Sequence, residues 1–180
     1  MKLPRTIRLD PSDGFVFEHA AEPGEWAVTG SFLFWDADPA TLGPKARAAF
    51  RAGFVGVVSI GFSTLVTVAE ASEAERDAAV AALAGHLLAR FGAPDEAAAR
   101  AAACEELDVA ASLCDHPVGT LIAMHRRLDG DRIREQFRTL RPRGTDPLHA
   151  QARAFTVVEA EDEEPTETVD LLGLLETKRT

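Results

Sequence analysis

Residues 104–116, with the sequence CEELDVAASLCDH, gather the side chains that most often bind metals or carry redox chemistry. The segment holds both cysteines of the 180-residue chain, one histidine and four carboxylates. These residue types suit a metal site, a disulfide, or a thiolate activated by a neighbouring imidazole. Geometry decides among them, because the apolar pattern over residues 95–115 predicts a helix.

A helix over residues 95–115 places the two sulfurs too far apart to act together. Cys104, Leu107, Ala111 and Cys114 fall on one apolar stripe of that helix. Ten residues of helix span about 15 Å along the axis. A disulfide needs Cα atoms within about 7 Å, and a Zn–S bond is only about 2.3 Å long. We therefore predict that both cysteines are core residues, with no metal site and no cofactor.

The other polar groups of this segment have two alternative interpretations. Glu105 and Asp108 could supply two ligands to a hard cation, but a solvated helix face is the simpler interpretation. Cys114 and His116 could form a reactive pair if the chain bends before Pro117, where helical backbone is disfavoured.

The remainder of the chain carries no recognisable catalytic or phosphate-binding motif. The patterns G-x-G-x-x-G, G-x-x-x-x-G-K-[ST], G-x-S-x-G and H-E-x-x-H are all missing from the sequence. We therefore assign no catalytic residue, and the sequence does not decide whether the protein is an enzyme.

Composition indicates an ordinary globular protein. Hydrophobic residues make up 46% of the chain and charged residues 27%. No apolar run is long enough for a transmembrane helix, and the N-terminus lacks the apolar core of a signal peptide. We expect a cytoplasmic protein with residues 1–158 as one globular domain. Residues 159–180 are expected to form an acidic linker with a leucine-containing end.

Charge is distributed unevenly along the chain. The net charge of −10 disfavours nucleic acids and anionic membranes as partners. Residues 125–143 are the exception, because this segment contains seven arginines and only three acids. Residues 159–170 are the opposite extreme, with seven acids and no base.

The predicted fold is α+β, a mostly antiparallel sheet with two long helices packed on one side. The helices are expected at about 73–91 and 95–115; the first has a capping box of Ser72 and Glu75. The alternating or β-branched segments predict strands, and KARAAFRA predicts a short helix that ends at Gly53. Strands are expected at 5–9, 15–18, 26–35, 120–128, 131–140 and 152–160. Residues 54–69 fit either one long bent strand or a tight pair.

The strands on either side of Asp129-Gly130 form a predicted hairpin with a two-residue loop. Leu128 then pairs with Asp131. One face holds five apolar residues together with two charged ones: Ile122, Met124, Leu128, Ile133 and Phe137, with Arg126 and Glu135. The other face is the predicted binding site, named here the arginine face: His125, Arg127, Arg132, Arg134 and Arg138.

This register sets Arg127 opposite Arg132 and His125 opposite Arg134. Like charges directly opposite each other destabilise a sheet by a few tenths to about 1 kcal/mol per pair. An anionic group is therefore expected over the arginine face.

The predicted function is non-catalytic binding through the arginine face, the acidic tail, or both. A protein partner or the chain's own tail is the expected occupant, and a second copy of the chain or a small anion would also suit the charge. The alternative is a small enzyme or small-anion-binding protein whose site combines dispersed residues in a sheet–helix cleft. The run EELDVAASLCDHPVGTLIAMHRRL resembles small uncharacterised bacterial proteins over about residues 54–140, which implies no activity.

Overall fold

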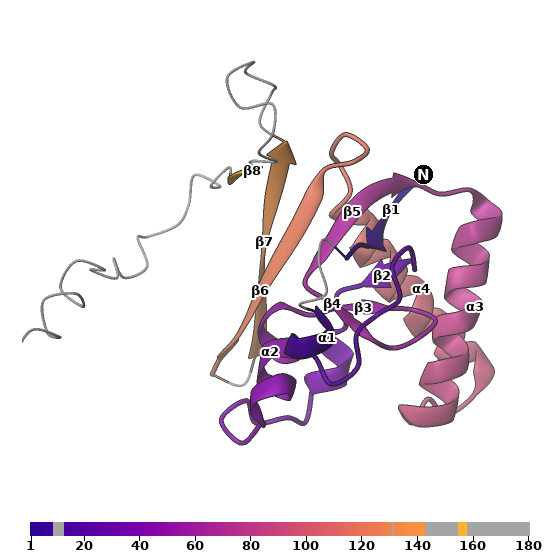
Figure 1. The fold of residues 1–180 in the computed structure, drawn as a ribbon. Coiled ribbons are helices and arrows are strands. Elements are labelled where there is room, and N and C mark those ends of the chain that lie inside the picture. The colour runs from indigo at the N-terminus through magenta and orange to yellow at the C-terminus, as the bar shows by residue number, and fades with distance from the viewer. Residues whose placement is uncertain (9–12, 131, 143–154, 158–180) are drawn as a thin grey trace, which may run out of the picture.

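The computed structural model describes residues 1–8, 13–130, 132–142 and 155–157 (Figure 1). Two antiparallel sheets and two long helices dominate this part of the chain. The larger sheet has the strand order β1-β5-β6-β7-β8. Its strands are β1 (Lys2–Thr6), β5 (Leu65–Glu70), β6 (Leu121–Asp129), β7 (Arg132–Pro142) and β8 (Phe155–Val157). The smaller sheet contains β2 (Ala27–Val28), β3 (Phe54–Gly56) and β4 (Phe62–Ser63). The predicted α+β class is confirmed.

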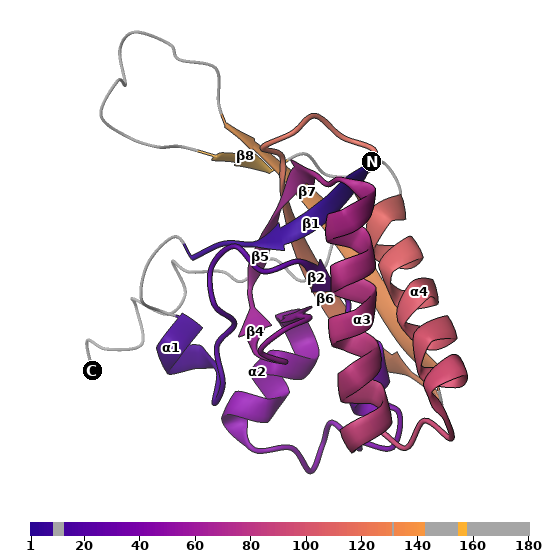
Figure 2. The ribbon, with the colours of Figure 1, turned by 90° about the vertical axis from the view of Figure 1, so that its right-hand side faces the viewer.

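Both long helices form close to their predicted positions, as α3 (Glu73–Arg90) and α4 (Glu96–Ser112). The predicted capping box is present, because Ser72 accepts a hydrogen bond from the Glu75 amide and the Glu75 carboxylate accepts one from the Ser72 amide. Asp95 caps α4 by accepting a hydrogen bond from the Ala98 amide. The two helices pack side by side on one side of the molecule, as predicted (Figure 2).

The smaller sheet lies between the two helices and the larger sheet. Its valines Val28 and Val55 share a core cluster with Leu83 of α3 and Leu107 of α4. Ala27 and Phe54, the neighbours of those valines, belong to a second cluster with Val66, Ile122 and Met124 of the larger sheet. Successive side chains of a strand point to opposite faces, so these short strands contribute to both cores.

The helix predicted to end at Gly53 is α2 (Pro44–Ala52), and the Gly53 amide donates to the carbonyl of Ala49. Its Phe50 ring packs edge-on against Phe34 with ring centroids 5.4 Å apart. Phe17 joins them in a third, aromatic cluster beneath the hairpin of β6 and β7.

Two predicted strands are wrong, and the strand predicted over residues 5–9 is displaced to Lys2–Thr6. Residues 15–18 do not form a strand, because Phe15 and Val16 belong to the short helix α1 (Asp13–Val16) and the two residues that follow have no regular structure. The strand predicted over 26–35 stops at Val28, and the 3₁₀ helix η1 (Ser31–Phe34) follows. Gly30 causes the break: its φ of 75° is left-handed. A Cβ at this position would lie 2.2 Å from Cγ2 of Val55, so the close approach also requires glycine.

Residues 54–69 form neither one strand nor a simple pair. β3 and β4 make a tight hairpin with Val55 opposite Phe62, and β5 begins two residues after β4 ends. Gly61 allows the hairpin to pack closely against Ala20, because a Cβ at position 61 would lie 2.6 Å from backbone atoms of Ala20. The last predicted strand, 152–160, is represented by β8, and its remainder lies outside the described residues with the tail 159–180.

The hairpin of β6 and β7 forms, but the predicted register is wrong by two positions. Leu128 pairs with Ile133, and Asp129 and Arg132 form the last pair before the turn. Cross-strand pairing explains why this register forms. It sets the apolar Leu128 opposite Ile133 and the opposite charges of Arg126 and Glu135 against each other, and both kinds of pair stabilise a sheet. The predicted oppositions of Arg127 with Arg132 and of His125 with Arg134 are therefore incorrect. A shift of two positions keeps every side chain on its predicted face.

Both cysteines are free, and both lie against core clusters. Cys104 is partly buried on α4, whereas Cys114 is buried just beyond the end of that helix. Burial raises the pKa of the Cys114 thiol to about 11. Thiolate formation at neutral pH is thereby suppressed.

We expect Cys114 to react with a thiol reagent such as dithionitrobenzoate only after denaturation, because the thiolate is the reactive species. Mass spectrometry of the labelled protein would identify the modified cysteine, with the unfolded chain as the reference for complete reaction. Rapid modification of Cys114 in the native protein at pH 7 would contradict this prediction.

Candidate functional site

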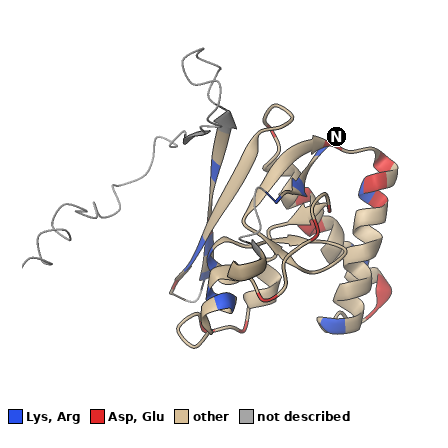
Figure 3. Cartoon of the chain, in the orientation of Figure 1, with Lys and Arg blue, Asp and Glu red and all other residues tan. Residues whose placement is uncertain are grey.

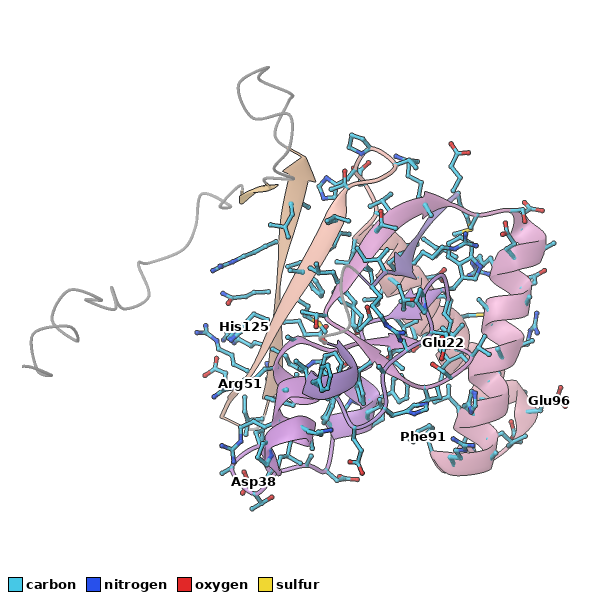
Figure 4. All side chains as sticks on the ribbon, in the orientation of Figure 1. Glu22, Asp38, Arg51, Phe91, Glu96 and His125 are labelled. Carbon is cyan, nitrogen blue, oxygen red and sulfur yellow. The ribbon has the colours of Figure 1, made fainter. Side chains whose placement is uncertain are left out.

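The arginine face is exposed, and all five predicted residues lie on it. His125 and Arg127 come from β6, and Arg132, Arg134 and Arg138 come from β7. In Figure 3 the blue ribbon segments that mark Lys and Arg recur along β6 and β7, and in Figure 4 His125 lies on the outer side of this hairpin, away from α3 and α4. The structure therefore brings the predicted residues together on one surface.

Positive charge dominates the arginine face. Arg127 lies directly opposite Arg134, while His125 lies opposite Gln136. Asp129 is the single acid that strand alternation places on this face of β6 and β7. Four arginines and one aspartate give a net charge of +3 with the histidine neutral. Nε of Arg134 lies 2.5 Å from Oδ2 of Asp129, an exposed pair worth about 0.2–1 kcal/mol.

The opposite face of the same hairpin contains a buried ion pair, which the sequence did not identify as a site. Arg126 is 1% exposed, and its Nη2 lies 2.8 Å from Oε1 of Glu135. Its Nη1 donates to the Phe50 carbonyl at 2.9 Å, and Nη2 donates to the Thr29 carbonyl at 2.5 Å. The guanidinium therefore joins β6 and β7 to α2 and to the segment before η1.

Local structure explains why an arginine is needed at position 126. Phe50 lies in the last turn of α2, where carbonyls have no partner within the helix and a cation is favourable. The Arg126 guanidinium lies 5.3 Å from the ring centroid of Phe34, within cation–π range. The sequence contained one indication of this ion pair: Arg126 and Glu135 are the two charged residues on the otherwise apolar face of the hairpin.

Glu106 of α4 lies near this pair and has an unusual environment. Its Oε2 is buried and has no hydrogen-bond partner among the described residues. Burial raises the pKa of Glu106 to about 7, with a further increase from Glu135 and an opposing effect of Arg126. A carboxyl group with this pKa exchanges a proton near neutral pH, which is common at functional sites and also occurs in structural networks.

A cavity of about 790 Å³ opens beside Glu106, between η1, the end of α3 and the start of α4. Aromatic and aliphatic side chains form most of its wall, and Figure 4 labels Phe91 at the end of α3. Its charged lining residues are Asp36, Arg90, Glu105 and Glu106. Trp35 is 75% exposed at the rim and also borders a hollow of about 680 Å³ that contains Glu135. Glu105 and Glu106 belong to the segment 104–116 that the sequence analysis singled out, but the other lining residues come from η1 and the residues after it, the end of α3 and the start of α4, so the sequence alone could not locate the cavity.

Among the described residues, the helices fall short of the length and apolar character needed to span a membrane. The model of a family described as a family of unknown function, DUF6505, matches residues 1–158. The chain therefore belongs to that family. Neither a curated protein nor a solved structure matches the chain.

Proposed function

We propose that this member of the DUF6505 family is a non-catalytic binding protein whose arginine face accepts an extended acidic segment of a protein partner. The observation that carries the proposal is Arg127 directly opposite Arg134 on an exposed sheet face with one acid, Asp129. Like charges opposite each other are unfavourable across a sheet. An anionic occupant would remove that cost.

An extended acidic polypeptide suits this surface better than a compact anion. Side chains on one face of a strand repeat every second residue, which is about 6.6–6.8 Å. Alternate acids in an extended peptide repeat at the same distance, so three of four successive acids can meet Arg132, Arg134 and Arg138, with Gln136 opposite the fourth. Arginine also presents a planar fork of donors that matches a carboxylate.

A labelled peptide of alternating Glu and Thr should bind the full-length protein at low salt. Changing both Arg127 and Arg134 to Glu should reduce its affinity at least about tenfold, because attraction becomes repulsion. Fluorescence anisotropy measures this change. Physiological salt should weaken the binding, because screening shortens the electrostatic range to about 8 Å.

The matched control changes Lys45 and Arg100 to Glu. Both residues are exposed on α2 and α4, and the substitutions alter the net charge by the same amount. This control should keep most of the affinity. Equal losses in the two double variants, or binding of a Gln-Thr peptide as strong as that of the Glu-Thr peptide, would contradict the proposal.

A second candidate function is supported by the unpartnered, buried Oε2 of Glu106 at the cavity beside η1. Three acids, Asp36, Glu105 and Glu106, line the cavity against Arg90. This charge favours a ligand with an apolar body and an ammonium group over a small anion. Aromatic walls add hydrophobic and cation–π attraction for such a ligand.

The probes for this candidate are phenethylamine and phenylpropionate, which share an apolar body and differ in charge. We expect saturation-transfer NMR to detect binding of phenethylamine but not of phenylpropionate. The Glu106→Gln variant should lose most of the phenethylamine signal, because it lacks the carboxylate that would pair with the ammonium group. Equal signals from both probes, or an unchanged signal in the variant, would exclude the cavity as an amine site.

A further inference from the structure

Glu106 places a buried carboxyl group in the wall of the cavity beside η1. Its Oε2 has no hydrogen-bond partner among the described residues. A carboxylate that leaves water needs hydrogen bonds or a cation to remain ionised. Because no donor reaches Oε2, burial favours the protonated, neutral form of this group.

The charged groups closest to Glu106 do not reverse this preference. Burial has the largest effect on the pKa of Glu106 and raises it. Glu135 of β7 and Glu105 of α4 raise it further, whereas Arg126 of β6 lowers it. The Arg126 guanidinium already binds Glu135 at 2.8 Å, so its charge is largely compensated. The resulting pKa is about 7.

The other elements packed against α4 direct their basic side chains elsewhere. Helix α3 and strand β1 both contact α4. Three of their basic side chains have partners of their own: Arg76 with Asp108, Arg5 with Glu75, and Lys2 with the His116 carbonyl. Arg90 of α3 and Asp36 after η1 are the charged residues that the facing walls of the cavity contribute. Neither a histidine nor a cysteine is among the described residues that line this cavity, so Glu106 is the lining group that titrates near neutral pH.

The cavity suits a cation with an apolar body. Its volume of about 790 Å³ lies within the usual range for small-molecule sites, roughly 300–1,000 Å³. Phe32 and Phe91 form part of its wall with ring centroids 5.5 Å apart, and aromatic faces attract ammonium groups. The charged lining residues carry a net charge of −2 with Glu106 ionised and −1 with Glu106 protonated. Ionisation of Glu106 therefore strengthens the attraction for a cation.

We propose that this cavity takes up an organic ammonium ion in exchange for the proton of Glu106, so that it binds the cation weakly at pH 6 and strongly at pH 8. The exchange balances, because the ammonium ion enters, the proton leaves to solvent, and the carboxylate that remains pairs with the ammonium group. This inference rests on the second candidate function, the amine site, and adds its regulation by pH. It also extends the ligand class to quaternary ammonium ions, which have no proton of their own to lose.

The probe is phenethyltrimethylammonium, whose charge is the same at every pH, so that any pH dependence belongs to the protein. Isothermal titration calorimetry of the full-length protein should give an affinity about tenfold higher at pH 8 than at pH 6. The reason is that about one Glu106 in ten is ionised at pH 6, and the apparent affinity scales with the binding-competent fraction. Titrations at pH 7 in two buffers of different ionisation enthalpy should show release of about half a proton per bound cation.

Two single variants assign the proton to its group. Glu106→Gln should bind the probe weakly, with equal affinity at pH 6 and pH 8 and without proton release, because its amide does not titrate. The matched control is Glu96→Gln, which alters the net charge by the same amount at an exposed position of α4 outside the cavity wall (Figure 4). This control should keep both the pH dependence and the proton release of the natural protein.

The results distinguish this inference from the amine site on which it rests. Equal affinity of the natural protein at pH 6 and pH 8, or binding at pH 7 without proton release, would overturn the inference while the amine site stands. A tenfold change that persists in Glu106→Gln would assign the proton to another group and would also overturn it. If the probe binds at neither pH, the second candidate function fails together with the inference.

Discussion

Replacement of Arg126 by methionine should lower the free energy of unfolding by about 3–5 kcal/mol, the cost of breaking a buried ion pair by removing one partner. The side chain of Glu135 is 17% exposed and would lose its cation. The carbonyls of Phe50 and Thr29 would lose their donor, and each unsatisfied buried acceptor adds about 1–3 kcal/mol of penalty before relaxation. Denaturation in urea at pH 7 measures the change.

Two comparisons show whether the loss comes from the ion pair itself. The double variant Arg126→Met, Glu135→Leu should recover part of the loss, since replacing both charges with apolar groups removes the uncompensated carboxylate. Arg127→Met, one residue away on the exposed arginine face, should change stability by no more than about 0.5 kcal/mol. Equal effects of the two single methionine variants would show that Arg126 is not the central connection between β6, α2 and η1.

Replacement of Glu106 by glutamine should stabilise the protein at pH 8 and have little effect at pH 4. The folded protein raises the pKa of this carboxyl from 4.5 to about 7, so between those values it keeps a proton that the unfolded chain releases. Stability of the natural protein therefore falls as pH rises through this window. Each pKa unit corresponds to about 1.4 kcal/mol, and partial exposure reduces the total to about 2–3 kcal/mol.

Thermal or urea denaturation of both proteins across pH 4–8 would reveal this difference. Glu105→Gln is the matched control, because Glu105 is exposed on the adjacent position of α4. This control alters the net charge by the same amount and leaves the buried carboxyl group of Glu106 in place. A constant difference between the Glu106→Gln variant and the natural protein from pH 4 to pH 8 would show that Glu106 titrates normally.

The features determined by local chemistry could be predicted from the sequence. Ser72 and Asp95 cap α3 and α4 through contacts within three residues, so the starts of both helices were predicted to within one or two residues. The placement of His125, Arg127, Arg132, Arg134 and Arg138 on one exposed face of the hairpin could also be predicted. The strand alternation of the hairpin determines that face, and the error of two positions in register preserves the alternation.

The features that depend on distant contacts could not be predicted in this way. Gly30 adopts its left-handed conformation against Val55, so the strand pattern over residues 26–35 gave no sign of η1. The carbonyl of Phe50 receives its donor from Arg126, which lies 76 positions along the chain. Glu106 owes its raised pKa to burial and to Glu135, and a single sequence shows neither.

Binding of an acidic segment at the arginine face is tested most directly by titrating the Glu-Thr peptide into isotope-labelled full-length protein and following amide NMR signals. We predict shifts for residues of β6 and β7, including His125, Arg127 and Arg134, and no shifts for Phe91 or Glu106 at the cavity. Shifts confined to the cavity, or no shifts at any peptide concentration, would contradict the assignment of the arginine face as the binding surface.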